Sequence, residues 1–251
     1  RKAGGSLKLG YILGRDLSQR LKYQLKRTEI RNVDETASTL IKEQEGTNTV
    51  SQISQTTVFD KRDNRYEPKD GYVVSLTNEL AGLSGDTQHF RTRIKTGYFV
   101  SLFEDKVLAL IAESGHIIGI DQDVNIGERF FLGGQTVRGF SNSGIGPRDG
   151  TTNDALGGNN YYAGSIELRF PLGLGEELGI NGSLFTDVGS LWSLDRDSSD
   201  ILDSSGARAS AGFGLSWATG LGLMRVDFAS ALLKEDWDET EFVRFSFGTR
   251  F

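Results

Sequence analysis

Apolar and polar side chains alternate along most of this chain, in segments of about ten residues. Residues 7–13 are apolar at every odd position, and residues 20–26 place Leu21, Tyr23 and Leu25 between basic and amide side chains. A period of two residues gives a β-strand one apolar and one polar face. These segments lack the three-and-four spacing of an amphipathic helix, so they are predicted as strands.

The same alternation predicts about eleven strands and no helix in the whole chain. It is clearest in six later segments, which are 72–80, 90–100, 162–170, 178–188, 211–217 and 243–251. Segments near 48–60, 106–118 and 221–232 are predicted as strands with a less regular pattern. Many of these strands are longer than the five or six residues usual in soluble sheets and are long enough to cross a bilayer at a slant. The pattern therefore favours an all-β, antiparallel, up-and-down transmembrane β-barrel over a soluble β-sandwich, which also alternates.

The predicted connections sort by length onto the two ends of the sheet. The longest are at 31–47, 119–159 and 193–206. An even number of predicted strands separates each of them from the next, so an up-and-down sheet places all three at one end. Shorter turns lie at the other end, and the short loop at 82–86 is an exception on the long-loop side. Long outer loops and short inner turns are typical of outer-membrane barrels.

The odd number of predicted strands needs an explanation. Bacterial single-chain barrels usually have even strand numbers, and an open sheet edge in lipid leaves backbone groups unpaired. The chain starts at Arg1, inside a strand-like pattern. We therefore expect residues 1–251 to be a single but partial barrel domain whose N-terminal strands are missing.

Composition excludes several classes of protein. The chain has 32 glycines, 3 prolines, 2 histidines and no cysteine, which excludes disulfides, thiolate metal sites and cysteine nucleophiles. A net charge of −6 argues against nucleic-acid binding. No apolar run approaches the length of a membrane helix.

Basic residues form a stripe on the predicted polar faces of two strand regions. They are Arg20, Lys22, Lys26, Arg91, Arg93 and Lys95. We interpret this stripe as part of a wet barrel interior, balanced by acidic residues on neighbouring strands, and not as a nucleic-acid surface.

Some patterns resemble functional motifs but do not meet their requirements. Asp121, Asp123 and Asn125 are spaced like the start of a calcium loop, yet Gly127 falls one position late and Leu132 stands where glutamate is needed. No phosphate-loop lysine follows the later glycines, and neither histidine has the serine and aspartate partners needed for hydrolysis. We therefore predict no catalytic residue, no metal site and no cofactor.

Several segments in the second half of the chain carry a family resemblance. They are 129–140, 144–149, 155–159, 165–171 and 185–192, with V-R-G-F at 137–140 and F-x-D-x-G at 185–189. In this order they strongly resemble the C-terminal barrel of the BamA family of bacterial outer-membrane protein assembly factors, in the POTRA-transporter superfamily. Residues 60–71 also resemble a turn that enters a mid-barrel strand of that family, so the resemblance covers essentially the whole chain.

The resemblance implies a sixteen-stranded barrel preceded by periplasmic POTRA domains. The eleven strands would correspond to the sixth to sixteenth strands, so the first five strands and the POTRA domains would be absent. The loop at about 119–159 would fold back into the barrel. There Arg138 would be held by Glu167 and Asp187, which alternation independently places on the polar, lumen-facing side. The loop motif would comprise Gly133, Gly134, Val137, Gly139 and Phe140.

The last strand, residues 242–251, is apolar on one face and ends in an aromatic residue. Phe245, Phe247 and Phe251 resemble the C-terminal sorting signal of outer-membrane barrels, and in the family this strand forms one side of a lateral gate. An exposed strand edge can template an incoming strand. An ordinary closing strand with an aromatic girdle residue would show the same pattern.

The implied function is non-enzymatic folding and insertion of client β-barrels through a lateral seam in the bacterial outer membrane. The implied partners are unfolded outer-membrane proteins, outer-membrane lipid and lipopolysaccharide, accessory assembly lipoproteins and periplasmic chaperones. A two-partner-secretion transporter and a translocation-and-assembly-module barrel are the nearest alternatives, because both share the V-R-G-F/Y loop. The segments at 144–149 and 155–159 favour the assembly factor. A passive porin or a barrel phospholipase is less consistent with the residues.

Overall fold

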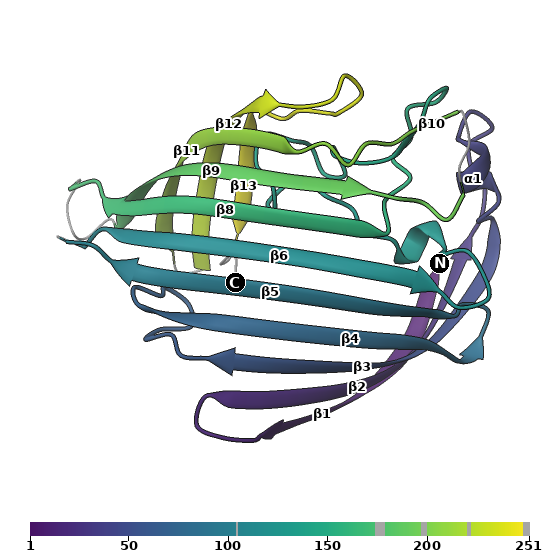
Figure 1. Cartoon of the computed structure of the whole chain (residues 1–251), viewed down its shortest axis with the longest axis horizontal. Helices are drawn as coiled ribbons and strands as arrows, with labels where there is room; N and C mark the ends of the chain where they lie inside the picture. The colour runs from purple at the N-terminus through teal and green to yellow at the C-terminus, as the bar shows by residue number, and fades with distance from the viewer. Residues whose placement is uncertain (104, 174–178, 197–199, 220–221, 248–251) are drawn as a thin grey trace.

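The computed structural model describes residues 1–103, 105–173, 179–196, 200–219 and 222–247. Within these residues, eleven strands form one antiparallel sheet (Figure 1). Their order across the sheet is the same as their order along the chain. The strands are β1 Lys2–Ile12, β2 Leu17–Ile30, β3 Gly46–Asp60, β4 Gly71–Gly85, β5 His89–Ser101, β6 Val107–Gly119, β8 Asn160–Pro171, β9 Ile180–Trp192, β11 Arg208–Thr219, β12 Gly222–Leu233 and β13 Val243–Phe247. The predicted strands and their antiparallel, up-and-down order are confirmed.

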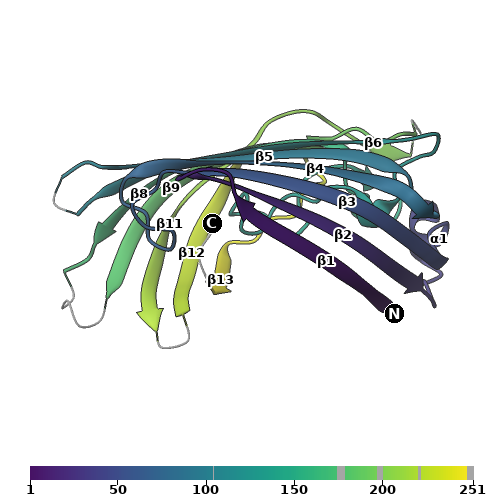
Figure 2. The same cartoon turned by 90° about the horizontal axis from the view of Figure 1, so that it is seen from below.

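The sheet is strongly curved. Figure 2 shows it as an arch, with the edge strands β1 and β13 on the same open side. In the described part of the chain, these two strands are the ends of the sheet and do not pair with each other. The curvature gives the sheet a convex outer face and a concave inner face.

The outer face is apolar and the inner face is polar, as the alternation predicts. On β8 and β9 the outward side chains of Ile166 and Leu184 are 58% and 54% exposed, whereas the inward Glu167 and Asp187 are fully buried. This arrangement is the inverse of a soluble sheet and suits a convex face in lipid. Among the described residues, no helix is long and apolar enough to span a membrane.

The long connections lie at one end of the sheet because consecutive strands are antiparallel. The predicted short loop at 82–86 is wrong in its bounds, since β4 continues to Gly85 and only residues 86–88 turn the chain. The carboxylate of Asp86 accepts a hydrogen bond from the backbone N–H of Thr49 at 2.8 Å and ties the turn to β3.

All three of the longest predicted loops contain short elements. Residues 31–45 include the one-turn helix α1 (Thr39–Lys42), capped by the side chain of Ser38, so the expectation of no helix is wrong here. Four residues are too few to leave an amphipathic stripe in the sequence. The loop at 193–207 contains β10 (Ile201–Leu202), which pairs with β7 (Arg148–Asp149) of the long loop.

The main apolar core lies between the loop at 120–159 and the inner wall of β6, β8 and β9. Its members are Ile117, Val124, Phe130, Leu132, Val137, Phe140, Ile145, Tyr161, Ala163 and Leu191. Six of these ten residues come from the loop, so the loop is packed against the concave face. The loop at 120–159 therefore lies on the concave side of the sheet.

Candidate functional site

The inward loop makes a tight hairpin around the V-R-G-F tetrad. The backbone N–H of Gly134 donates to the carbonyl oxygens of Phe140 and Ser141 at 3.0 and 3.1 Å. Gly133 and Gly139 have φ values of 125° and 88°, a region that side-chain-bearing residues rarely adopt. A Cβ on Gly133 would stand 2.2 Å from the carbonyl oxygen of Ser141. The glycines therefore permit the turn that presents Arg138 to the wall.

Arg138 binds the two acidic residues that the resemblance assigned to it. Its Nη1 donates to Glu167 Oε2 at 2.6 Å. Its Nε and Nη2 donate to the two carboxylate oxygens of Asp187, both at 2.7 Å, which is a bidentate geometry. The backbone N–H of Arg138 also donates to Asp187 at 3.0 Å. Glu167 and Asp187 stand on β8 and β9, so the loop is bound to two adjacent strands.

The network around Arg138 contains residues that the sequence reasoning missed. Arg225 on β12 donates to both carboxylate oxygens of Glu167 at 3.1 and 2.8 Å and to Asp227 at 2.8 Å. Arg169 Nε donates to Glu167 at 2.7 Å. The guanidinium carbon of Arg138 lies 3.3 Å from the centroid of the Phe185 ring. Arg225 and Asp227 alternate with apolar neighbours on β12. That alternation was the available sign that both side chains face the polar interior.

Buried charge is balanced within this network. Three guanidinium groups, those of Arg138, Arg169 and Arg225, face three carboxylates, those of Glu167, Asp187 and Asp227. Burial lowers the pKa of the Arg138 guanidinium, but hydrogen bonding and charge from Asp187 and Glu167 raise that pKa above its ordinary value. The guanidinium of Arg138 therefore stays charged, and the arrangement suits a fixed structural anchor.

The residues on either side of Arg138 pack against the barrel wall. The side chains of Val137 and Phe140 are completely buried. A Cβ on Gly139 would meet the Cβ atoms of Ser210 and Ala229 at 3.2 and 3.4 Å. The carbonyl oxygen of Gly139 accepts from the backbone N–H of Glu241, which joins the tetrad to the β12–β13 connection.

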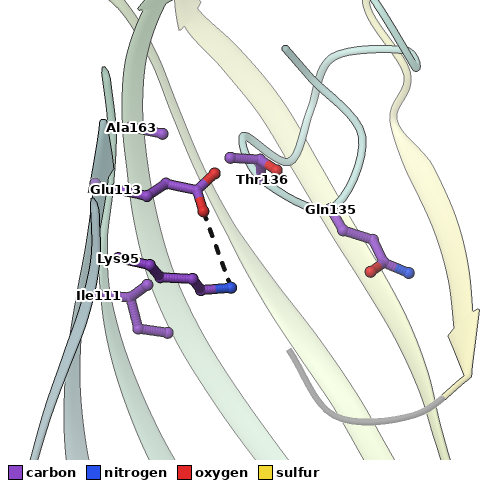
Figure 3. Close-up of a pocket in the computed structure, with 7 residues that line it drawn as sticks. Lys95, Ile111, Glu113, Gln135, Thr136 and Ala163 are labelled. Atoms are coloured by element: carbon purple, nitrogen blue, oxygen red, sulfur yellow. Dashed lines mark ion pairs between the residues drawn. The ribbon is translucent and has the colours of Figure 1, made fainter. Parts of the chain in front are cut away.

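The tip of the loop stands across a small cavity from the wall (Figure 3). Gln135 and Thr136 lie on the loop side, and Lys95 and Glu113 form an ion pair of 3.9 Å on β5 and β6. The cavity has a volume of about 120 Å³, enough for a few water molecules. A larger cavity of about 590 Å³ borders the network, next to Arg138 and Glu167.

The predicted C-terminal signal lies partly outside the described residues. Phe245 and Phe247 on β13 are 72% and 70% exposed on the outer face. Phe251 falls outside the part of the chain that the structure describes. The backbone of β13 pairs with β12 along residues 243–247 and forms the C-terminal edge of the sheet.

The two histidines stand in the wall of the sheet. His89 on β5 is 1% exposed and His116 on β6 is exposed. No group of three or more histidine, aspartate or glutamate side chains in the described ranges is arranged to hold a metal ion.

Comparison with known proteins agrees with this geometry. A family model described as the Omp85 superfamily domain matches residues 1–251. The chain is 39% identical over 244 residues to the outer membrane protein assembly factor BamA of Neorickettsia risticii, covering 96% of the chain and 33% of that protein. It is 36% identical over 171 residues to the sorting and assembly machinery component 50 homolog of Xenopus tropicalis, covering 67% of the chain and 36% of that protein. The chain thus spans about a third of the length of these relatives.

A crystal structure of BamA from Haemophilus ducreyi lacking POTRA domains 1–3 has the same fold. It matches with a TM-score of 0.83 at 21% identity, covering 99% of this chain and 54% of that one. The predicted resemblance to the assembly-factor family is confirmed by the family model and by the identity to BamA. The chain therefore belongs to the Omp85 superfamily of outer-membrane β-barrel proteins.

Proposed function

We propose that this chain is the barrel part of a factor that folds and inserts client β-barrels into the bacterial outer membrane. The similarity to BamA and to sorting and assembly machinery component 50 supports this function. The observation that carries it is the inward loop, which is bound to the concave wall by Arg138 through Glu167 and Asp187. A passive porin needs an open lumen, whereas this loop occupies the lumen side of β8, β9 and β12.

In this proposal Arg138 is the loop anchor. Its side chain is 2% exposed, so its charge depends on the carboxylates of Glu167 and Asp187 for stabilisation. Val137, Phe140 and the hairpin glycines fix the tetrad in the one position where Arg138 reaches both acids. The loop thereby fixes the positions of β8 and β9 relative to the C-terminal strands.

The C-terminal strand is the proposed templating edge. The outer edge of β13 carries backbone groups that an incoming strand can pair with. Phe245 and Phe247 point to the convex face, where their rings contact lipid. In this mechanism the barrel opens sideways at a lateral seam that β13 borders, and client strands add to the free edge of β13. No enzymatic step, metal or other cofactor takes part in this mechanism.

The proposed partners follow from this activity. Unfolded outer-membrane proteins are the clients, and outer-membrane lipid and lipopolysaccharide surround the convex face. Accessory assembly lipoproteins and periplasmic chaperones deliver the clients. Nucleic acid is not a partner, because the net charge of −6 opposes phosphate binding.

The proposal is tested by client folding with the full-length protein in liposomes. Wild-type protein accelerates the folding of a denatured outer-membrane protein, and Arg138→Ala reduces the rate about tenfold or more, because the loop loses its ion pairs to Glu167 and Asp187 on the wall. Arg65→Ala is the matched control, since the Arg65 side chain is 81% exposed in a turn. Steady pore conductance without accelerated folding would instead identify a porin.

A two-partner-secretion transporter gives a different result in the same liposomes. It moves its secreted partner across the bilayer and does not fold unrelated barrels. Acceleration of two unrelated client barrels by wild-type protein therefore distinguishes the assembly factor from this relative.

A further inference from the structure

The base of the inward loop carries a buried carboxylate, that of Glu128, whose ion pairs are separate from those of Arg138. Glu128 ends the short 3₁₀ helix η1 (Ile126–Glu128) and is 7% exposed. It has no part in the contacts of the Arg138 anchor. A buried acid needs cationic partners, and those of Glu128 come from a different part of the wall.

Glu128 binds two residues of the basic stripe. Lys26 Nζ on β2 donates to Glu128 Oε1 at 3.1 Å. Arg91 Nη2 on β5 lies 3.3 Å from Glu128 Oε2 and also donates to the main-chain oxygen of Glu128. Arg91 Nη1 donates to Glu79 on β4 at 2.8 Å. Lys26 and Arg91 are therefore balanced by one acid from the loop, Glu128, and one from the neighbouring strand β4, Glu79.

An aromatic contact continues the same attachment. The ring of Phe130, two residues after Glu128, has the guanidinium carbons of Arg91 and Arg93 each 5.5 Å from its centroid. Its centroid is 4.7 Å from the ring of Tyr161 on β8. Phe130 is 6% exposed. The charged contacts of Glu128 and the aromatic contacts of Phe130 together hold this part of the loop against the wall.

We propose that Glu128 is a positioning residue that fixes the base of the inward loop to β2 and β5 through Lys26 and Arg91. This second anchor acts on different strands from Arg138, which binds β8 and β9. The loop is thereby attached to both flanks of the concave face. The role of the anchor in assembly rests on the proposed function, whereas the attachment itself does not.

The alternative role of Glu128 is simple neutralisation of the basic stripe. Glu79 provides the matched control, because it also pairs with Arg91 but belongs to the wall. Both Glu128→Gln and Glu79→Gln remove one negative charge next to Arg91. Only Glu128→Gln removes ion pairs between loop and wall, those to Lys26 and Arg91. A difference between the two variants is therefore not an effect of net charge. Lys26→Met breaks the same attachment without changing the residues beside Arg129, so it separates loss of attachment from a direct effect of residue 128 on the trypsin site, and it is expected to accelerate cleavage as well.

The test is limited trypsin digestion of the full-length protein in liposomes, with cleavage after Arg129 followed by mass spectrometry. Arg129 adjoins Glu128, and its side chain is bound within the loop to the carbonyl oxygens of Val124 and Leu156. Glu128→Gln is expected to accelerate this cleavage about tenfold, and Glu79→Gln to leave it unchanged. The double variant Lys26→Met with Glu128→Gln is expected to match Glu128→Gln alone, because the pair is already broken.

Unchanged cleavage in Glu128→Gln, or equal acceleration in Glu79→Gln, would overturn the proposal. Client folding is measured on the same samples, and Glu128→Gln is expected to slow it several-fold. Faster cleavage with unchanged client folding would overturn the role of this anchor in assembly. If wild-type protein does not accelerate client folding, the proposed function fails, and the cleavage comparison still decides the attachment.

Discussion

Arg138 is held by the shape of its side chain as much as by its charge. Its guanidinium group forms hydrogen bonds to Glu167, Asp187 and Ser165. A guanidinium presents its donors in a rigid fork that matches two carboxylates at once, whereas an ammonium is a single point charge. The position therefore requires arginine, which completes the hydrogen bonding of Glu167 and Asp187 from the loop side.

At the residue scale, the hairpin glycines are expected to be sensitive to a single methyl group. Gly133→Ala places a Cβ 2.2 Å from the carbonyl oxygen of Ser141 at a φ of 125°, so it is expected to lower the free energy of unfolding by about 2–3 kcal/mol. Gly127→Ala is the control, because a Cβ there meets nothing within 4 Å. Denaturant titration in lipid vesicles measures both. Equal stabilities would show that the hairpin can relax around the added carbon.

At the element scale, each strand separates lipid from the polar interior by alternation. On β8, Ile166 is 58% exposed on the convex face and Glu167 beside it is fully buried. A shift of one residue in pairing would exchange these faces, so the apolar pattern determines the register. The strand register therefore follows from having lipid on the convex face and a polar interior on the concave face.

The depth of an outward residue in the membrane is expected to determine the cost of a charge there. Ile166→Lys, near the middle of β8, is expected to lower the free energy of unfolding by about 2–4 kcal/mol. Ile118→Lys, one residue from the end of β6, is expected to cost about 0–1 kcal/mol because the lysine reaches the interface. Denaturant titration in vesicles compares the two variants. Equal costs would contradict the assignment of the convex face to lipid.

At the scale of the whole molecule, ion pairs connect strands that are not neighbours. Two strands, β9 and β11, separate β8 from β12 in the sheet, yet Arg225 on β12 binds Glu167 on β8. This contact is possible because the sheet curves and brings the inner faces together. The inner charge network and the packed loop therefore hold the curvature of the wall.

This connection is expected to appear as coupling between distant substitutions. In a double-mutant cycle of Glu167→Gln and Arg225→Met, the double variant is expected to cost about 1–3 kcal/mol less than the sum of the single variants. The exposed pair Lys69 and Asp105 is the comparison, and its substitutions are expected to be additive. Free energies of unfolding from denaturant titration give both cycles. Additivity at Glu167 and Arg225 would show that the network does not hold the curvature.

The sequence by itself determined the strands, their faces and the end on which the long loops lie, because alternation depends only on neighbouring residues and on the medium. It also placed Glu167 and Asp187 on the inner face, while their pairing with Arg138 came from the family resemblance. The tertiary structure decided the partners that come from distant strands, such as Arg225 with Glu167 and Lys26 with Glu128. These pairs depend on the curvature of the sheet and on the path of the loop, and neither leaves a local pattern in the sequence. The short helix α1 was missed for the related reason that one turn is too short to show a period.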